Sequence, residues 1–112
     1  MLAQTNRLSA RQVEAVIKGG KVFHSPNFTL RFLALKTGQA KIAAVAPAKA
    51  VKKAVQRNRM RRLIYEAVRP LLPGLKNDVQ TIVLAKSSAV NLNLTDISKE
   101  LAGLFEKAVL LR

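Results

Sequence analysis

The sequence predicts an α+β fold, a two-layer α/β sandwich in which helices pack on one small mixed sheet. Segments with apolar residues at helical spacing alternate with short segments of strand composition. Of the 112 residues, 49% are hydrophobic, which is enough for one core in a chain of this length. We therefore expect a single domain over residues 1–112, in the order helix, two or three strands, helix, strand, helix.

The first expected helix covers residues 10–18. Ser9 and Gln12 have the spacing of a capping box, which opens a helix by satisfying its first amide groups. Gly19 and Gly20 end the helix, since glycine tolerates the left-handed backbone conformation at a helix C-terminus.

Short apolar runs between turn residues indicate the next strands. Alternation in residues 28–35 places Phe28, Leu30, Phe32 and Ala34 on one face of a strand. Residues 41–46 form a second apolar run that suits a buried strand, and residues 22–25 could add a third, short strand.

A long helix is expected over residues 53–69, a strand over 79–86 and a last helix from Thr95 or Asp96 to residue 109. Each helix carries one apolar stripe, which predicts that it packs on the sheet through that side. The stripe of the long helix consists of Met60, Leu63, Ile64, Ala67, Val68 and Leu71. The stripe of the last helix consists of Ile97, Leu101, Leu104, Phe105 and Ala108.

Positive charge is concentrated in one part of the chain. Twenty Lys and Arg residues oppose six Asp and Glu residues, and the net charge is +14. Residues 49–69 hold eight basic residues and one acid, Glu66, so this segment carries +7, half of the total. Such a local excess predicts a binding surface for a polyanion. The eight basic residues are Lys49, Lys52, Lys53, Arg57, Arg59, Arg61, Arg62 and Arg69.

The long helix should offer part of this charge to a partner. At 100° per residue, Asn58, Arg61, Arg62, Tyr65 and Arg69 project from the side opposite the apolar stripe. Arginine forks suit bidentate contacts with phosphates. Asn58 has two open interpretations: its amide could contact a partner, or it could satisfy groups within the fold.

Several classes of function are disfavoured. The chain has no Cys, which excludes disulfides and cysteine-ligated metals. The six acids are dispersed, so no carboxylate cluster for metal-dependent hydrolysis is expected, and we predict no catalytic residue and no metal site on the protein. Asp96 and Glu100 are expected to form a solvated pair, and His24, the one histidine, to be a surface residue. No signal-peptide run or membrane span is found, which makes a cytoplasmic protein without a membrane partner the default.

Residues 54–64, AVQRNRMRRLI, resemble the Arg-Asn-Arg signature of the bacterial ribonuclease P protein family. The resemblance extends along nearly the whole chain. It includes Asn6-Arg7-Leu8 before the first helix, Phe28-Thr29-Leu30 in the first long strand, residues 78–86 in the strand after the basic helix, and Leu101, Leu104 and Phe105 in the closing helix.

The resemblance implies a left-handed crossover through the basic helix and a role as an RNA-binding subunit. The family protein binds a catalytic RNA, and the complex removes the 5′ leader from precursor tRNA with Mg²⁺ bound mainly by the RNA. The basic residues and Asn58 would then face the catalytic RNA. A cleft between the sheet and the first helix would hold the leader through Val13, Ile17, Phe28 and Arg31.

Leader contact should rely more on charge than on stacking, since Val13, Ile17 and Arg31 stand where the family often has aromatic residues. The alternative is a ribosomal or other structural RNA-binding protein, which composition alone leaves open.

Overall fold

The computed structural model describes residues 10–34, 41–74 and 79–108. The expected order of elements is confirmed, and the short third strand is present. Ser9, the expected cap of the first helix, lies outside the described residues. The elements are α1 (Ala10–Gly19), β1 (Lys21–His24), β2 (Phe28–Ala34), β3 (Lys41–Val45), α2 (Ala54–Val68), β4 (Val79–Ala85) and α3 (Leu94–Lys107), with 3₁₀ turns η2 (Arg69–Gly74) and η3 (Ser87–Asn91).

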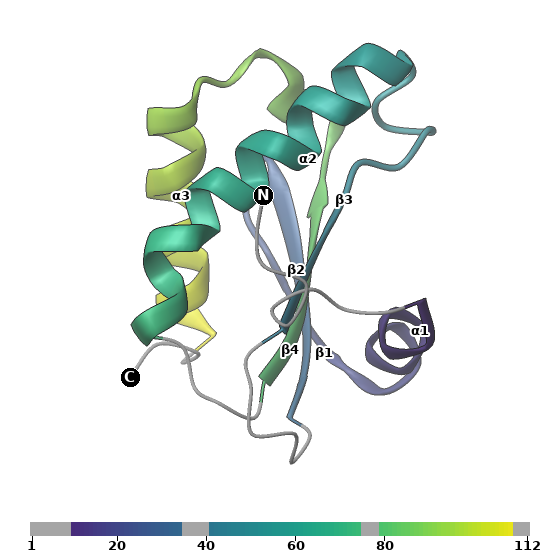
Figure 1. Ribbon diagram of the computed structural model, residues 1–112, viewed down its shortest axis with the longest axis vertical. Coiled ribbons are helices and arrows are strands. Elements are labelled where there is room, and N and C mark those ends of the chain that lie inside the picture. Colours follow the sequence, from purple (N-terminus) through teal and green to yellow (C-terminus); the bar gives the residue numbers. More distant parts are fainter. Residues whose placement is uncertain (1–9, 35–40, 75–78, 109–112) are drawn as a thin grey trace.

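The four strands form one mixed sheet in the order β1-β2-β4-β3. The central strand β4 pairs antiparallel with β2 and parallel with β3, so that Ile82 lies between Arg31 and Ala43. Helix α2 connects the parallel neighbours β3 and β4 along one face of the sheet (Figure 1). With β3 in front of β4 in this view and α2 to their left, the crossover is left-handed.

Helices cover both faces of the sheet. Helices α2 and α3 pack side by side on one face, over a core that contains Phe28, Met60 and Phe105 (Figure 1). Helix α1 packs on the other face, where Val16 meets Ala43 and Ile82 in a smaller apolar cluster. The short helix α1 thus adds a partial third layer to the expected sandwich.

Most residues of the two predicted helix stripes are buried, while Leu63 and Leu71 of the first stripe are partly buried and pack against the core. Met60, Ile64, Ala67 and Val68 of α2 are buried, as are Ile97, Leu101, Leu104 and Phe105 of α3.

The expected cap of α3, Thr95 or Asp96, was wrong by two or three residues. Asn93 is the N-cap, and its side-chain oxygen accepts a hydrogen bond of 2.8 Å from the amide of Asp96.

The junction between α1 and β1 depends on Gly20. Its amide donates to the carbonyl of Val16 at 2.8 Å, and the chain enters β1 at the next residue. A Cβ atom on Gly20 would lie 2.5 Å from the carbonyl oxygen of Val16 and 2.7 Å from that of Phe32. Only glycine fits this approach of two backbones without a shift, so Gly20 fixes α1 against the sheet.

Glu100 connects α3 to the turn between β1 and β2, contrary to the expectation of a solvated pair with Asp96. Its carboxylate accepts hydrogen bonds from the Asn27 amide at 2.8 Å, from Asn27 Nδ2 at 2.7 Å and from the Ser25 hydroxyl. Partial burial alone raises the pKa of this carboxyl, but the hydrogen bonds and the charge of Lys86 outweigh it and lower the pKa overall.

Candidate nucleic-acid interface

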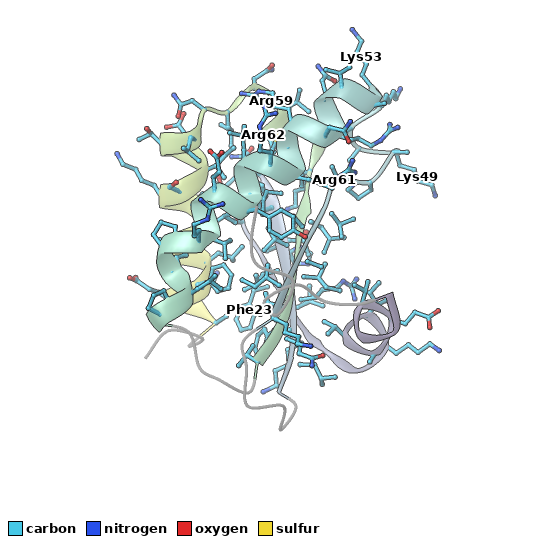
Figure 2. All side chains as sticks on the ribbon, in the orientation of Figure 1. Phe23, Lys49, Lys53, Arg59, Arg61 and Arg62 are labelled. Atoms are coloured by element: carbon cyan, nitrogen blue, oxygen red, sulfur yellow. The ribbon has the colours of Figure 1, made fainter. Side chains whose placement is uncertain are left out.

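The predicted basic residues lie on α2 and on the loop that leads into it, except Arg69, which begins η2 directly after the helix. We call this region the α2 surface; it comprises Lys49, Lys52, Lys53, Arg57, Asn58, Arg59, Arg61, Arg62 and Arg69. Figure 2 shows Arg59, Arg61 and Arg62 along α2, with Lys49 and Lys53 on the loop at its N-terminal end. One segment of the chain therefore places most of the local charge excess on one side of the molecule.

The loop before α2 presents three exposed lysines, Lys49, Lys52 and Lys53. The Pro47 carbonyl shapes this loop by accepting hydrogen bonds from the amides of Ala50 (3.0 Å) and Val51 (2.8 Å). Lys53 occupies the N-cap position, and its side chain makes no capping hydrogen bond.

The residues at this helix N-terminus differ from those that usually stabilise one. Helix N-termini favour Ser, Thr, Asp or Asn caps and acidic first turns, because the helix dipole is positive there. The first turn of α2 has no acid, and lysines precede it. The lysines therefore add their positive charge to the positive end of the helix dipole.

The guanidinium of Arg57 forms hydrogen bonds within the protein. Its Nη1 donates to the carbonyl of Lys52 at 2.7 Å and to that of Val51 at 3.1 Å. The half-buried guanidinium thereby ties the first turn of α2 to the preceding loop.

Arg59 forms hydrogen bonds with residues that are distant in the sequence. Its Nη1 donates to the Val90 carbonyl at 3.2 Å and its Nη2 to the Leu92 carbonyl at 3.3 Å. These carbonyls belong to the segment between β4 and α3, so Arg59 joins α2 to the start of α3. Both arginines of the Arg-Asn-Arg motif thus have partners within the protein.

Asn58 also has an internal partner, since its side-chain oxygen accepts a hydrogen bond from Arg61 Nη2 one turn along the helix. Asn58 and Arg62 are exposed, and Arg61 is half-buried. Arg69 follows the last residue of α2 and is exposed; its backbone amide donates to the Tyr65 carbonyl.

The outward position expected for Tyr65 was wrong. Tyr65 is half-buried, and its hydroxyl accepts a hydrogen bond of 3.1 Å from the amide of Ala44. Ala44 belongs to β3, an edge strand whose outer backbone groups lack a neighbouring strand. Tyr65 thereby satisfies a backbone donor of the sheet.

Phe28, one of the four predicted leader-binding residues, was assigned to the wrong face of the sheet. Its side chain is fully buried in the core beneath α2 and α3. Side chains alternate along a strand, so Phe28 and Leu30 face the α2 side while Arg31 and Leu33 face the α1 side. Phe28 is a core residue and cannot contact RNA in this fold.

The other three predicted leader-binding residues lie together on the α1 side. Val13 is half-buried and packs on the small cluster, Ile17 is 49% exposed, and Arg31 is half-buried. The strand register adds three residues that sequence reasoning missed, namely Val22, His24 and Thr29. Val22 lies directly opposite Arg31, and His24 lies directly opposite Thr29. We call this region the α1-side surface; it comprises Val13, Ile17, Val22, His24, Thr29 and Arg31.

An aromatic pair lies on the other face of the sheet. Phe23 and Phe32 stack with ring centroids 5.7 Å apart, and both pack against the large core cluster. The α1-side surface thus has aliphatic and basic side chains in place of aromatic ones.

The described part of the chain contains no group of three or more His, Cys, Asp or Glu side chains that could hold a metal ion. Among the same residues, no helix is both long and apolar enough to span a membrane.

Comparison with known proteins identifies the family. A family model described as Ribonuclease P matches residues 2–109 of this chain. The chain belongs to the ribonuclease P protein family. The ribonuclease P protein component of a Synechococcus strain is 31% identical to it, over 99% of this chain and 87% of that protein. The corresponding protein of Microcystis aeruginosa is 33% identical, over 96% of this chain and 93% of that protein.

Solved structures show the same fold. The ribonuclease P protein of Staphylococcus aureus superposes with a TM-score of 0.86 at 18% identity, over 97% of this chain and 100% of that chain. The Thermotoga maritima protein superposes with a TM-score of 0.80 at 19% identity, over 90% and 96%. Ribonuclease P family membership supports the role of its RNA-binding protein subunit and does not favour the alternative of a ribosomal protein.

Proposed function

We propose that this chain binds the catalytic RNA of ribonuclease P through the α2 surface and the 5′ leader of precursor tRNA through the α1-side surface. The observation that carries the proposal is the group of exposed lysines at the N-terminal end of α2, where helix stability would favour acids. Phosphates of a folded RNA would neutralise these charges and release condensed counterions.

The two surfaces face different directions. The α2 surface lies on the helix that covers one face of the sheet. On the other face, α1 carries Ile17, and Arg31 extends from β2 toward the α1 side. One protein could therefore contact the catalytic RNA and the single-stranded leader at the same time.

In this proposal, the RNA catalyses hydrolysis of the phosphodiester bond. The dispersed acids provide no pair of carboxylates for metal-dependent hydrolysis of a phosphodiester. Mg²⁺ bound mainly by the RNA would supply that chemistry, while the cations of this chain lower the repulsion between two polyanions. The protein would thus act in a tRNA-processing endoribonuclease without supplying a catalytic residue.

Reconstitution tests the proposal. The purified chain is combined with a bacterial ribonuclease P RNA at low Mg²⁺, and cleavage of a precursor tRNA is measured. We expect cleavage by the complex and none by the protein alone. The triple variant Lys49→Ala, Lys52→Ala, Lys53→Ala should require more protein or more Mg²⁺ for the same rate.

Lys99→Ala provides the control, since Lys99 is exposed on α3, in a part of the chain with balanced charge. It should behave like the parent. Cleavage by RNA-free protein, or equal losses for Lys99→Ala and the triple variant, would contradict the proposed function.

A further inference from the structure

Strand β1 forms one edge of the sheet. Among the described strands, β1 pairs with β2 alone, and α1 packs mainly on β2 and β4. The side chains of β1 that face the α1 side are consequently open: Val22 is 38% exposed, and His24 is exposed.

A hydrogen bond with Thr29 positions the side chain of His24. Its Nδ1 lies 3.2 Å from the hydroxyl of Thr29, which is directly opposite in the β1–β2 pair. Such a bond orients the imidazole ring on the strand. No other described contact involves the second ring nitrogen, which remains available to a partner.

The charges around His24 are positive. Arg31 lies diagonally across from it on β2, within reach of long side chains. Lys86 follows β4, and its ammonium donates at 2.7 Å to the carbonyl of Ser25, the residue after His24. The four strands contain no acidic residue.

Among the described residues, no charged side chain makes a hydrogen bond or an ion pair with His24. Helix α1 carries Glu14 and Lys18, which are both exposed. The carboxylate of Glu100, on α3, is occupied by Ser25 and Asn27. An anion from outside would therefore be the natural partner for the imidazole.

We propose that His24 is a leader-binding residue that contacts a phosphate of the single-stranded leader beside Arg31, so that leader affinity rises as the histidine is protonated. This inference rests on the proposed function and adds a residue and a regulation to it. Charge complementarity selects the occupant: the half-buried Arg31 and the exposed Lys18 attract an anionic strand. The exposed Ile17 and Val22 offer apolar contact to its bases.

Proton linkage gives the size of the effect. Histidine titrates near neutral pH, and a phosphate in contact favours the imidazolium form. A tenfold preference for the charged form of a histidine corresponds to an affinity increase of about sixfold between pH 8 and pH 6. Mature tRNA lacks the leader, so its affinity should not show this increase.

The experiment measures binding of precursor and mature tRNA to the reconstituted complex from pH 6 to pH 8, with Ca²⁺ in place of Mg²⁺ to slow cleavage. The readout is the ratio of the two affinities. His24→Gln can still hydrogen-bond to Thr29 but cannot be protonated, and its ratio should stay at the low, alkaline value. His24→Lys is charged throughout, and its ratio should stay high. Arg31→Ala should lower the ratio at every pH and retain its slope.

The outcomes separate this inference from the proposed function. If the parent complex neither cleaves precursor nor prefers it over mature tRNA at any pH, the proposed function fails. If the parent does prefer precursor but His24→Gln keeps the same pH dependence, only the role of His24 is overturned. Because His24 is the sole histidine of the chain, no second imidazole can produce the effect.

Discussion

Arg59 and Arg62 should respond to substitution in opposite ways, although they lie one turn apart on the same basic helix. Arg59 donates to two carbonyls of the segment before α3, whereas Arg62 is exposed. Arg59→Ala therefore removes two internal hydrogen bonds, and Arg62→Ala removes a charge that can reach a phosphate.

The magnitudes follow from these contacts. At about 1 kcal/mol for each hydrogen bond, Arg59→Ala should cost about 2 kcal/mol of unfolding free energy. In a domain of this size that loss lowers Tm by roughly 8 °C or more. Arg62→Ala should change stability by less than about 0.5 kcal/mol. In binding to the catalytic RNA, it should flatten the slope of log affinity against log salt by about one unit.

Arg59→Lys separates charge from geometry. Lysine keeps the positive charge but lacks the planar fork that reaches two carbonyls. We expect Arg59→Lys to lose stability nearly as Arg59→Ala does and to keep the salt slope of the parent.

The assay combines thermal unfolding with a salt titration of RNA binding, for the parent and the three variants. Both measurements are needed, because a weakened fold lowers affinity without changing the number of phosphate contacts. If Arg59→Ala keeps the Tm of the parent and flattens the salt slope as Arg62→Ala does, then Arg59 leaves its carbonyls to bind RNA, and the reasoning is wrong.

Three further predictions concern the fold. Phe105→Ala empties a fully buried position and should cost about 3–5 kcal/mol in chemical denaturation; an unchanged midpoint would show that the stripe of α3 is misplaced. Gly20→Ala should destabilise the chain through two backbone clashes, whereas Gly103→Ala, which meets no atom within 4 Å on α3, should stabilise it by up to about 1 kcal/mol; thermal unfolding compares the two. Glu100 has a lowered pKa in the fold, so its contribution is complete above its ordinary value of 4.5 and is lost as pH falls through the lower folded value; unfolding free energies from pH 6 to pH 3 should decline more steeply for the parent than for Glu100→Gln.

The apolar periodicity of the sequence was sufficient to predict the helices and their buried sides. Met60 and Ile64 of α2, and Leu101 and Phe105 of α3, lie in the core as their spacing requires. Periodicity works here because each of these helices has one face against the sheet and one in solvent.

The assignment of Phe28 to the leader surface conflicted with the sequence itself. Phe28 and Arg31 are three positions apart, and residues an odd number apart on a strand point to opposite faces. The alternation that grouped Phe28 with Leu30 already placed it in the core.

The internal bonds of the basic residues could not be predicted from local sequence. The partners of Arg59 lie 31 and 33 positions away along the chain, and the hydroxyl of Tyr65 meets an amide 21 positions away. A helical projection shows the direction in which a side chain leaves its helix, but it does not show which distant backbone groups lie in that direction. Charge counts therefore overstate the number of cations free to bind RNA.

The order of strands in the sheet has a consequence for synthesis of the protein. The central strand β4 is the last strand in the sequence, and both β2 and β3 pair with it. Until residues 79–85 have left the ribosome, β3 has no partner and β2 can pair only with β1. Folding must then close long loops before it gains the contacts that stabilise the sheet, which slows the process. During this interval the nascent chain exposes unpaired strand edges together with an apolar stripe on α2, and we expect it to depend on chaperones more than a helical protein of equal length would.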